Sequence, residues 1–311
     1  MTTVIFGGSG FIGRRLVALL QAEGENVVCA DLVSPALAGE LAGVRFARCD
    51  LRRFDDVVTL MLDVRPERAV NLAYMLGSEH APHVALQLNV IGMDHFFEAS
   101  RLTGVEHVVF GSSLAVNGLQ ADFGDRPVTE QDALLGSAYQ YATHKVFNER
   151  QAEDYRRKHG MRITSVRPAN VIGHDKVFGS VDHVQCITGP ALGKAVSFPY
   201  ADAMRSAVHV DDVAAAFARV ALGRPGHPAY NTGGNATSLG ELAELVRSVL
   251  PRAEISFGQH EGAKAGSTNY LIDNSRLRHE FGVEPLDLRQ CVLKIIADVR
   301  AENGLPPVQT T

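Results

Sequence analysis

Short apolar runs alternate with longer amphipathic stretches through the first half of the chain. The runs are rich in β-branched residues and predict six buried strands, at Thr3–Phe6, Asn26–Ala30, Val44–Arg48, Ala69–Leu72, His107–Gly111 and Arg162–Arg167. Apolar residues at helical spacing between them predict helices near Gly10–Glu23, Phe54–Val64, Val84–Thr103 and Ala138–His159. Strands that alternate with crossover helices are typical of a parallel sheet covered on both faces, so we expect a doubly wound, Rossmann-type α/β fold.

The alternation loosens after Arg167. Glycines and prolines interrupt the apolar pieces of the next thirty or so residues, which predicts the start of a smaller lobe. Two later segments are expected to return to the main sheet or its cover: Ser206–Ala221, in which Asp211 and Asp212 can cap a helix, and the strand-like Ala229–Thr232. We therefore expect a core domain at residues 1–170, joined by 206–233, and an α+β substrate lobe at 171–205 and 234–311.

Composition and charge narrow the class of protein. The 311 residues are 46% apolar, and a net charge of −5 comes with basic residues that are scattered along the chain. Such a chain can bury a large core, and it has no basic stripe for a nucleic acid or an anionic membrane. No apolar run approaches the roughly 20 residues of a membrane span. Four widely spaced cysteines indicate no disulfide framework or zinc site, so we expect a cytoplasmic protein with a small-molecule partner.

A glycine-rich turn follows the first predicted strand. Its sequence is GGSGFIG at residues 7–13, and a helical pattern begins within it. Small residues let the backbone turn tightly and approach a pyrophosphate, and the free N–H groups at a helix N-terminus favour an anion there. Glycines alone would suit any tight turn, but the flanking strand and helix favour a dinucleotide site.

Acidic and small residues follow the next strands at the same predicted edge of the sheet. Asp31 stands eighteen residues after the glycine turn, where a carboxylate can accept from both ribose hydroxyls and repel a 2′-phosphate, which favours NAD over NADP. Arg14 and Arg15 would soften that preference, and a turn or capping role is the structural alternative for Asp31. Asp50 could accept from the adenine amino group, and Asn71–Tyr74 would lie beside the nicotinamide-side ribose.

Ser113 and a tyrosine–lysine pair form the candidate catalytic set. Tyr141 and Lys145 are four residues apart on a predicted helix and therefore share one face, and Ser113 follows the fifth predicted strand. An ammonium beside a phenol stabilises the phenolate, so Lys145 is expected to lower the pKa of Tyr141. Tyr141 could then exchange a proton with a substrate hydroxyl while Ser113 holds the reacting oxygen and Lys145 bonds the ribose. This spacing is common on amphipathic helices, and the preceding dinucleotide pattern is what favours catalysis.

Jointly these motifs resemble the extended short-chain dehydrogenase/reductases, the NAD-dependent epimerase/dehydratase family, over essentially the whole chain. The matching pieces are GGSGFIG at 7–13, Asp31, Asp50, Asn71-Leu72-Ala73, Gly111-Ser112-Ser113, YATHK at 141–145 with Glu149, RPAN at 167–170, Arg205 with VHVDDV at 208–213, and Tyr230-Asn231. The resemblance implies an NAD-binding core, a Ser-Tyr-Lys catalytic set and nicotinamide contacts from the turn at Pro168–Val171. It also implies a homodimer built from the helices at 84–103 and 138–159.

The expected site residues form three sets. The catalytic set is Ser113, Tyr141 and Lys145. The residues expected to contact the cofactor, NAD, are Gly7, Gly10, Phe11, Ile12, Gly13, Asp31, Leu32, Asp50, Leu51, Leu72, Ala73, Tyr74, Ser112, Tyr141, Lys145, Pro168, Asn170 and Val171. The residues expected to contact the substrate are Met75, Ser78, Ser113, Asn117, Tyr141, Asn170, His183 and Arg205. His80 and His83 have no carboxylate or cysteine partners at metal spacing, so no metal is expected.

Departures from the sugar-nucleotide members argue against a sugar nucleotide as substrate. In the members that the chain resembles, residues at the positions of Asn170 and Arg205 contact the substrate diphosphate, and both are present. A further arginine is expected about ten residues before the segment 273–276, where this chain offers only Lys264, and a lysine lacks the bidentate fork. Asn117 stands where those members usually carry a tyrosine, and no Thr-Asp-Glu follows the serine pair as it would in a dehydratase.

We therefore expect a dehydrogenase that oxidises a secondary alcohol, or reduces the ketone, of a small substrate such as a hydroxy acid, an amino alcohol or a sugar-derived acid. An NAD-retaining sugar-nucleotide epimerase would use the same residues and is the first alternative. The alternative of another class is a non-catalytic NAD-binding regulatory protein, against which the intact catalytic set argues.

Overall fold

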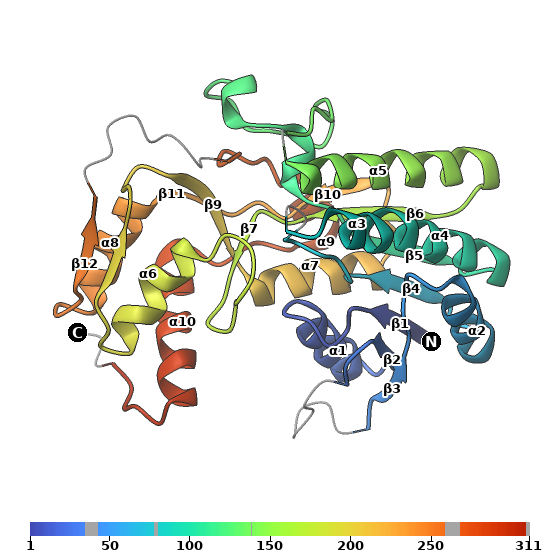
Figure 1. The fold of residues 1–311 in the computed structure, drawn as a ribbon, viewed down its shortest axis with the longest axis horizontal. Helices are drawn as coiled ribbons and strands as arrows, with labels where there is room; N and C mark the ends of the chain where they lie inside the picture. Colours follow the sequence, from blue (N-terminus) through green and yellow to red (C-terminus); the bar gives the residue numbers. More distant parts are fainter. Residues whose placement is uncertain (35–42, 78–79, 138, 259–267, 309–311) are drawn as a thin grey trace.

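A parallel sheet of seven strands forms the centre of the computed structural model, which describes residues 1–34, 43–77, 80–137, 139–258 and 268–308 (Figure 1). In spatial order the strands are β10 (Ala229–Asn231), β6 (Ile163–Arg167), β5 (His107–Gly111), β4 (Arg68–Asn71), β1 (Thr2–Phe6), β2 (Asn26–Asp31) and β3 (Arg45–Arg48). The six strands predicted in the first half are all present, and each of their ends lies within one residue of its predicted position. The later segment at Ala229 also joins this sheet, as β10.

Helices cover both faces of the main sheet, because successive side chains of each strand point to opposite faces. From β1, Val4 and Phe6 pack into one core with helices α2 (Phe54–Val64), α4 (Gly92–Thr103) and α5 (Gln140–His159). Ile5 packs into a second core with α1 (Gly13–Ala22), α7 (Val210–Leu222) and α9 (Ser275–Phe281). The prediction of a doubly wound α/β fold is therefore confirmed.

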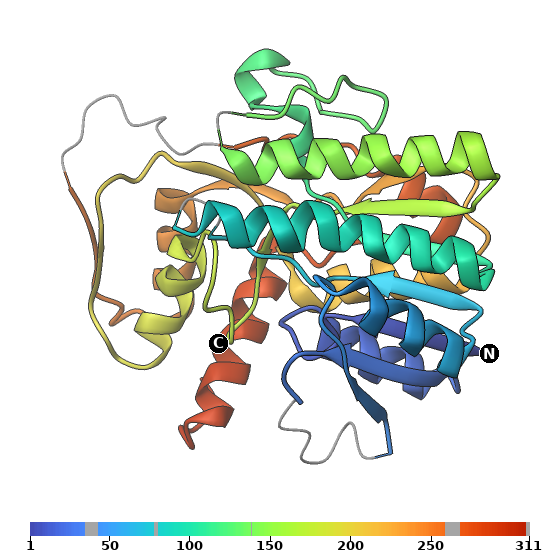
Figure 2. The ribbon, with the colours of Figure 1, turned by 45° about the vertical axis from the view of Figure 1, so that its right-hand side comes forward.

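A third core lies at one end of the main sheet, to the left in Figures 1 and 2. It is built from helices α6 (Asp182–Ala191), α8 (Leu239–Val249) and α10 (Leu288–Glu302), whose buried residues include Ile187, Leu242 and Ile295. Two small sheets accompany these helices: β7 (Asn170–Ile172), β9 (Met204–His209) and β11 (Asn235–Ser238), and the pair β8 (Val196–Phe198) and β12 (Ile255–Phe257). These elements lie opposite the N-terminus, and thus toward the carboxyl end of β1 (Figure 1).

The segment 206–221 differs in part from its prediction. Its first residues do not join the main sheet, because they belong to β9, which pairs with β7 and β11. Ala207 packs in the third core and Val208 in the second, so this strand connects the two. The helix that follows, α7, does cover the main sheet. Its N-cap is His209, whose ring nitrogen accepts from the Asp211 N–H at 3.2 Å, so the predicted capping by Asp211 or Asp212 is wrong.

The long helix predicted at Val84–Thr103 is broken into three pieces. It begins two residues early as α3 (Pro82–Leu86), since proline suits the first turn of a helix. A π-helical turn then occupies Gln87–Ile91 before α4 begins. The turn contains Asn89, which is fully buried, and π-turns of this kind are frequent at functional sites.

Candidate active site

The turn between β1 and α1 is too tight for side chains at two of its glycines. Gly7 has a φ of 75°, and a Cβ there would lie 2.5 Å from the backbone nitrogen of Ala73. A Cβ on Gly13 would overlap the carbonyl oxygen of Gly7. Residues 10–12 complete the turn, which is why α1 begins three residues later than predicted. The first N–H groups of α1 therefore lie at the carboxyl end of β1, in a cradle that fits a dinucleotide pyrophosphate.

Asp31 is held beside this cradle at the end of β2. One carboxylate oxygen accepts from the Ser9 backbone N–H at 3.1 Å, and the other accepts from the Leu32 N–H at 2.7 Å. The carboxylate is thus fixed against the glycine turn itself, and its predicted contact with a ribose would be made from the end of β2.

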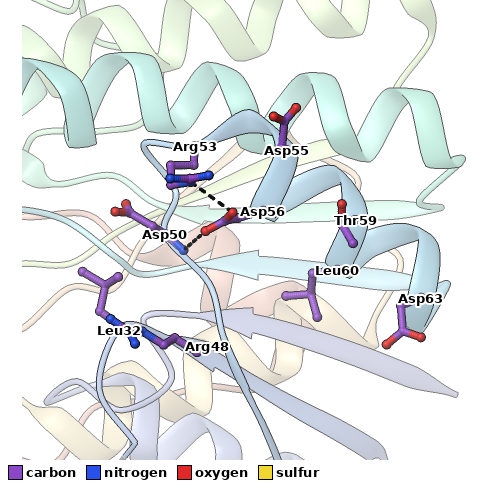
Figure 3. Close-up of a pocket in the computed structure, with 9 residues that line it drawn as sticks. All are labelled: Leu32, Arg48, Asp50, Arg53, Asp55, Asp56, Thr59, Leu60 and Asp63. Carbon is purple, nitrogen blue, oxygen red and sulfur yellow. Dashed lines mark hydrogen bonds and ion pairs between the residues drawn. The ribbon is translucent and has the colours of Figure 1, made fainter.

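A hollow of about 810 Å³ opens next to Asp31, between the ends of β2 and β3 and helix α2 (Figure 3). Leu32 and Asp50, two residues expected to contact the cofactor, both line it. Asp50 is paired with Arg52, whose side chain donates to it at 2.6 Å and holds the pKa of the carboxyl below its usual range. An adenine amino group at Asp50 would therefore share this carboxylate with an arginine.

Arg14 and Arg15 are committed to other partners. Arg15 donates to Asp175 at 2.9 Å, to Asp211 at 2.9 Å and to the Phe11 carbonyl at 2.8 Å, and Arg14 forms an ion pair with Asp175. These contacts tie the glycine turn to the loop after β7. Two carboxylates, Asp175 and Asp211, thus already engage the two arginines, and their effect on the preference for NAD stays a prediction.

The structure brings the three expected catalytic residues together. The Ser113 hydroxyl, which accepts from the Ala115 N–H at 3.2 Å, lies close enough to Tyr141 to act on the pKa of its phenol. The Lys145 amine lies 5.8 Å from the Tyr141 ring centroid and donates to the Gly111 carbonyl at 2.5 Å. Pro168 is also close, since its carbonyl accepts from the N–H of Leu114, next to Ser113, at 3.2 Å.

The ionisation of this set differs from the expectation. Burial raises the pKa of Tyr141, and the Ser113 hydroxyl only partly opposes this effect. Burial also lowers the pKa of Lys145 well below its usual value, against the attraction of Glu149. The predicted lowering of the Tyr141 pKa by Lys145 is therefore not found, because burial of the phenol is the larger effect. The Lys145 amine lies closer to another ring, that of Tyr74, at 3.2 Å from its centroid. Tyr141 is accordingly a protonated phenol that can donate to an oxygen.

A buried ion pair between Glu149 and Arg167 lies next to the proposed catalytic set. Glu149, one helical turn beyond Lys145, accepts from Arg167 on β6 at 2.7 and 2.5 Å and from the Ser112 hydroxyl at 2.6 Å. Burial alone would raise the pKa of Glu149, but the charge and hydrogen bonds of Arg167 bring it below its usual value. The pair fixes α5 to the ends of β5 and β6, and so fixes the helix that carries Tyr141 and Lys145.

Charged and polar residues cluster between β7 and β9, where substrate contacts were expected. The Lys176 amine donates to the Asn170 side-chain oxygen at 3.3 Å and to the carbonyls of Val171 and Ser180 at 2.8 and 2.7 Å. Burial lowers the pKa of Lys176 to about 8. This lysine joins the two ends of the loop that follows β7.

Asp182 lies between two cationic or titratable groups of this cluster. Its carboxylate is 3.6 Å from the Arg205 guanidinium and 3.5 Å from a ring nitrogen of His183. Burial works to raise the pKa of Asp182, but His183 and Arg205 together bring it down to about 2. The expected substrate residues His183 and Arg205 therefore share one carboxylate, which sequence reasoning had not singled out.

Other expected contacts have different places. Asn117 is fully buried and its amide nitrogen donates to the carbonyls of Asp132 and Ala133 at 3.3 Å, so it shapes that loop, and its contact with a substrate stays a prediction. The backbone of Met75 is bound on both sides by the Asn89 amide, at 2.8 and 2.9 Å. Ser78 and Lys264 lie outside the described residues.

Sequence reasoning also missed Asn148, which accepts from the Tyr74 hydroxyl at 3.4 Å and donates to the Asn89 carbonyl at 2.9 Å. The signal was its position seven residues after Tyr141 and three after Lys145, which puts a polar residue on the buried face of α5.

The described part of the chain contains no candidate membrane span and no candidate metal centre. None of its helices combines the length and apolar character needed to cross a membrane. The same residues contain no group of three or more His, Cys, Asp or Glu side chains that could hold a metal ion.

Comparisons with known proteins place these features in context. The sequence model of the NAD dependent epimerase/dehydratase family matches residues 3–233. A UDP-glucose 4-epimerase from Mycolicibacterium smegmatis is 29% identical over 92% of this chain and 94% of its own. The structure of Thermus thermophilus UDP-glucose 4-epimerase in complex with NAD is similar with a TM-score of 0.84 at 24% identity, covering 96% of this chain and 99% of that one. An L-threonine dehydrogenase structure from Cupriavidus necator has a TM-score of 0.83 at 22% identity, covering 96% and 100%.

Proposed function

This chain belongs to the NAD dependent epimerase/dehydratase family and is an NAD-dependent enzyme; we propose that it transfers a hydride between NAD and a secondary alcohol or ketone. The proposed substrate is small: a hydroxy acid, an amino alcohol or a sugar-derived acid. The observation that carries the choice of a small substrate is the charge balance around Asp182.

The proposed roles follow from the positions of the side chains. Bound NAD supplies the acceptor or donor of the hydride. The glycine turn would hold its pyrophosphate, Asp31 the adenosine ribose and Lys145 the nicotinamide-side ribose. Tyr141 would pass its proton to the substrate oxygen in the direction of reduction and recover it in the direction of oxidation, while Ser113, whose hydroxyl acts on the pKa of Tyr141, would hold that oxygen.

A diphosphate needs cations that are free to pair with it. Arg205 lies against Asp182, and the three N–H bonds of Lys176 can all be used by the three oxygens to which it donates. One negative charge thus already offsets part of the positive charge in this cluster. This balance suits a substrate with a single carboxylate better than one with two ionised phosphates.

Sugar-nucleotide epimerisation is the second candidate. It is favoured by the similarity to the M. smegmatis protein named UDP-glucose 4-epimerase and by the presence of Asn170 and Arg205. Tyr141 and Ser113 would serve that reaction unchanged, with NAD retained between the two hydride transfers.

The substrate class is tested by offering both kinds of compound to the purified protein. NADH formation is followed with a panel of hydroxy acids, amino alcohols and sugar-derived acids, and UDP-glucose is incubated separately and its products are separated by chromatography. We expect net NADH with a compound of the panel. Interconversion of UDP-sugars without net NADH would establish the epimerase instead, and NAD binding without any turnover would favour a regulatory role.

We also propose a homodimer formed through α4 and α5, which run side by side in Figure 2. Ile91 just before α4, Leu102 on α4 and Phe147 on α5 are about half exposed and apolar. We further propose a cytoplasmic location, to which four free cysteines are suited. The division into a cofactor domain (1–170 with 206–233) and a substrate lobe (171–205 and 234–311) remains a proposal, supported by the separate third core.

A further inference from the structure

We propose that Tyr74, in the loop after β4, is a positioning residue that holds the Lys145 amine in place and favours its protonated form by covering it with the face of the phenol ring. The proposal concerns the proposed catalytic set, but its primary test measures Lys145 itself and needs no substrate.

The contact between the Lys145 amine and the Tyr74 ring is short and shielded from water. The Lys145 amine lies 3.2 Å from the Tyr74 ring centroid, and Lys145 is only 4% exposed. An ammonium over an aromatic face is attracted by the negative face of the ring, and the attraction is larger when water is excluded. The amine also donates to the Gly111 carbonyl, so it is held between a carbonyl oxygen and a ring.

In the described part of the chain, no carboxylate forms an ion pair with the Lys145 amine. Glu149 attracts Lys145 from one helical turn away, but its oxygens are bonded to Arg167 and Ser112. The other titratable groups that act on Lys145 or lie beside it are Tyr141, a neutral phenol, and His144, whose own pKa is lowered by burial and by Lys145. The ring of Tyr74 therefore supplies a stabilising contact for the amine in addition to the Gly111 carbonyl.

The ring is fixed from two sides. Its hydroxyl donates to Asn148 at 3.4 Å, and Asn148 is bonded in turn to the Asn89 carbonyl. Asn89, in the π-helical turn, binds the backbone of Met75, the residue after Tyr74. The ring also packs edge to face on Tyr141, with centroids 5.5 Å apart. A side chain tied down in this way can define where the Lys145 amine sits relative to Tyr141.

The direct test is the titration of the Lys145 amine by NMR in protein labelled at the lysine ε-carbons. The chain has six lysines, and Lys145→Met identifies the signal. In Tyr74→Leu the amine stays buried but loses the ring, so the pKa of Lys145 should fall by about one unit, which corresponds to ~1.4 kcal/mol. Tyr74→Phe keeps the ring face and should leave this pKa unchanged. An unchanged or raised pKa in Tyr74→Leu would overturn the proposal.

A second comparison keeps the test valid if Tyr74→Leu does not fold. A ring-fluorinated phenylalanine at position 74 has nearly the shape of phenylalanine but a weaker negative ring face. Relative to Tyr74→Phe it should lower the pKa of Lys145, with the same melting temperature. Equal values for the two rings would show that Tyr74 acts only by filling space, and the proposal would be wrong.

Catalysis provides the functional readout once a substrate is known. In Tyr74→Leu the alkaline limb of the kcat profile should move to lower pH, and Tyr74→Phe should restore it. A change in KM alone, with the pH profile of the parent protein, would contradict a positioning role. If Tyr141→Phe retained full activity, the proposed proton donor would be wrong, whereas the NMR result for Tyr74 would still stand.

Discussion

Two regions of this molecule are each built around a lysine, Lys145 buried and Lys176 partly buried, and the amines of the two have different kinds of partner. Lys176, in the loop after β7, donates to three oxygens, two of them backbone carbonyls. Lys145, on α5, has one described acceptor, the Gly111 carbonyl, and otherwise lies on the face of Tyr74. Burial lowers the pKa of both.

The difference separates a structural lysine from a chemical one. An ammonium has three N–H donors, so Lys176 is saturated and holds a loop in shape. Lys145 keeps donors that a ribose hydroxyl could accept from, and it sits beside the phenol of Tyr141. Burial and a shifted pKa alone would not have distinguished the two, whereas the count of acceptors does.

The largest effect is expected from removing the amine on α5. Lys145→Met should lower kcat by about 10²–10⁴-fold, the range typical of groups that assist proton transfer, without lowering the free energy of unfolding. Steady-state kinetics and denaturant unfolding measure the two quantities. Lys176→Met is the matched control, and a similar loss of kcat in both variants would remove the distinction between the two lysines.

Breaking the ion pair beneath Lys145 should mainly affect stability. Glu149→Gln leaves Arg167 buried without a counter-charge and should lower the free energy of unfolding by about 3 kcal/mol. The folded pKa of Glu149 is below its ordinary 4.5. Its contribution is therefore full above that ordinary value and is lost as the pH falls through the folded pKa.

Urea unfolding at a series of acidic pH values checks both points. The control is Glu153→Gln, an exposed glutamate of the same helix paired with Arg150, which should change stability by less than about 1 kcal/mol. Equal effects of the two substitutions would mean that the buried pair is not what anchors α5.

Lys176→Met should act through the loop after β7. Val171, Ser180 and Asn170 would each lose a donor, and we expect a loss of roughly 1–3 kcal/mol in unfolding free energy. In the parent protein the folded pKa of about 8 lies below the ordinary 10.5, so this group makes stability rise with pH between those values.

Lys176→Met should lack this rise in the free energy of unfolding with pH. Unfolding curves measured between pH 8 and pH 10.5 would detect the difference. Lys194→Met, at an exposed lysine, is the control and should keep the rise. A rise of the same size in Lys176→Met would assign it to another group.

The smallest effect is expected for Asp31, on the preference of the predicted cofactor site for NAD over NADP. Asp31→Ala should reduce the preference for NAD over NADP by about 10-fold, or ~1.4 kcal/mol, because the negative charge that faces a 2′-phosphate is gone. The ratio of the two dissociation constants is measured by calorimetry. Asp55→Ala removes the same charge from the adjoining hollow and should leave the ratio unchanged, and equal changes in both variants would mean that Asp31 acts only through the general field.

The cofactor half could be predicted from the sequence because its determinants are local. The glycine turn, Asp31 and the strand ends each lie within one strand–helix unit, and the parallel sheet brings those ends together. Tyr141 and Lys145 were likewise predictable, since four residues on a helix fix their common face. The ionisation of the pair was not, because it depends on burial and on Tyr74, which comes from a distant loop.

The contacts in the expected substrate region were less predictable, because they too depend on residues that only the fold brings together. Lys176 bonds backbone carbonyls in its own loop, and Asp182 meets Arg205 only because β9 pairs beside β7. No residue spacing in the sequence predicts such contacts. Asn117 is a clear case: its position in the motif predicts a substrate contact, and nothing in the sequence predicts that its amide nitrogen also holds the loop at Asp132 and Ala133.

The central claim, that Tyr141 moves the proton while the neighbouring groups hold cofactor and substrate, is tested most directly by Tyr141→Phe. This change removes only the hydroxyl. With the substrate found in the NADH assay, turnover should fall by about 10²–10⁴-fold while the dissociation constant for NAD, measured by calorimetry on the same preparation, stays within about 2-fold of the parent value. Turnover that survives with NAD binding intact would contradict the account.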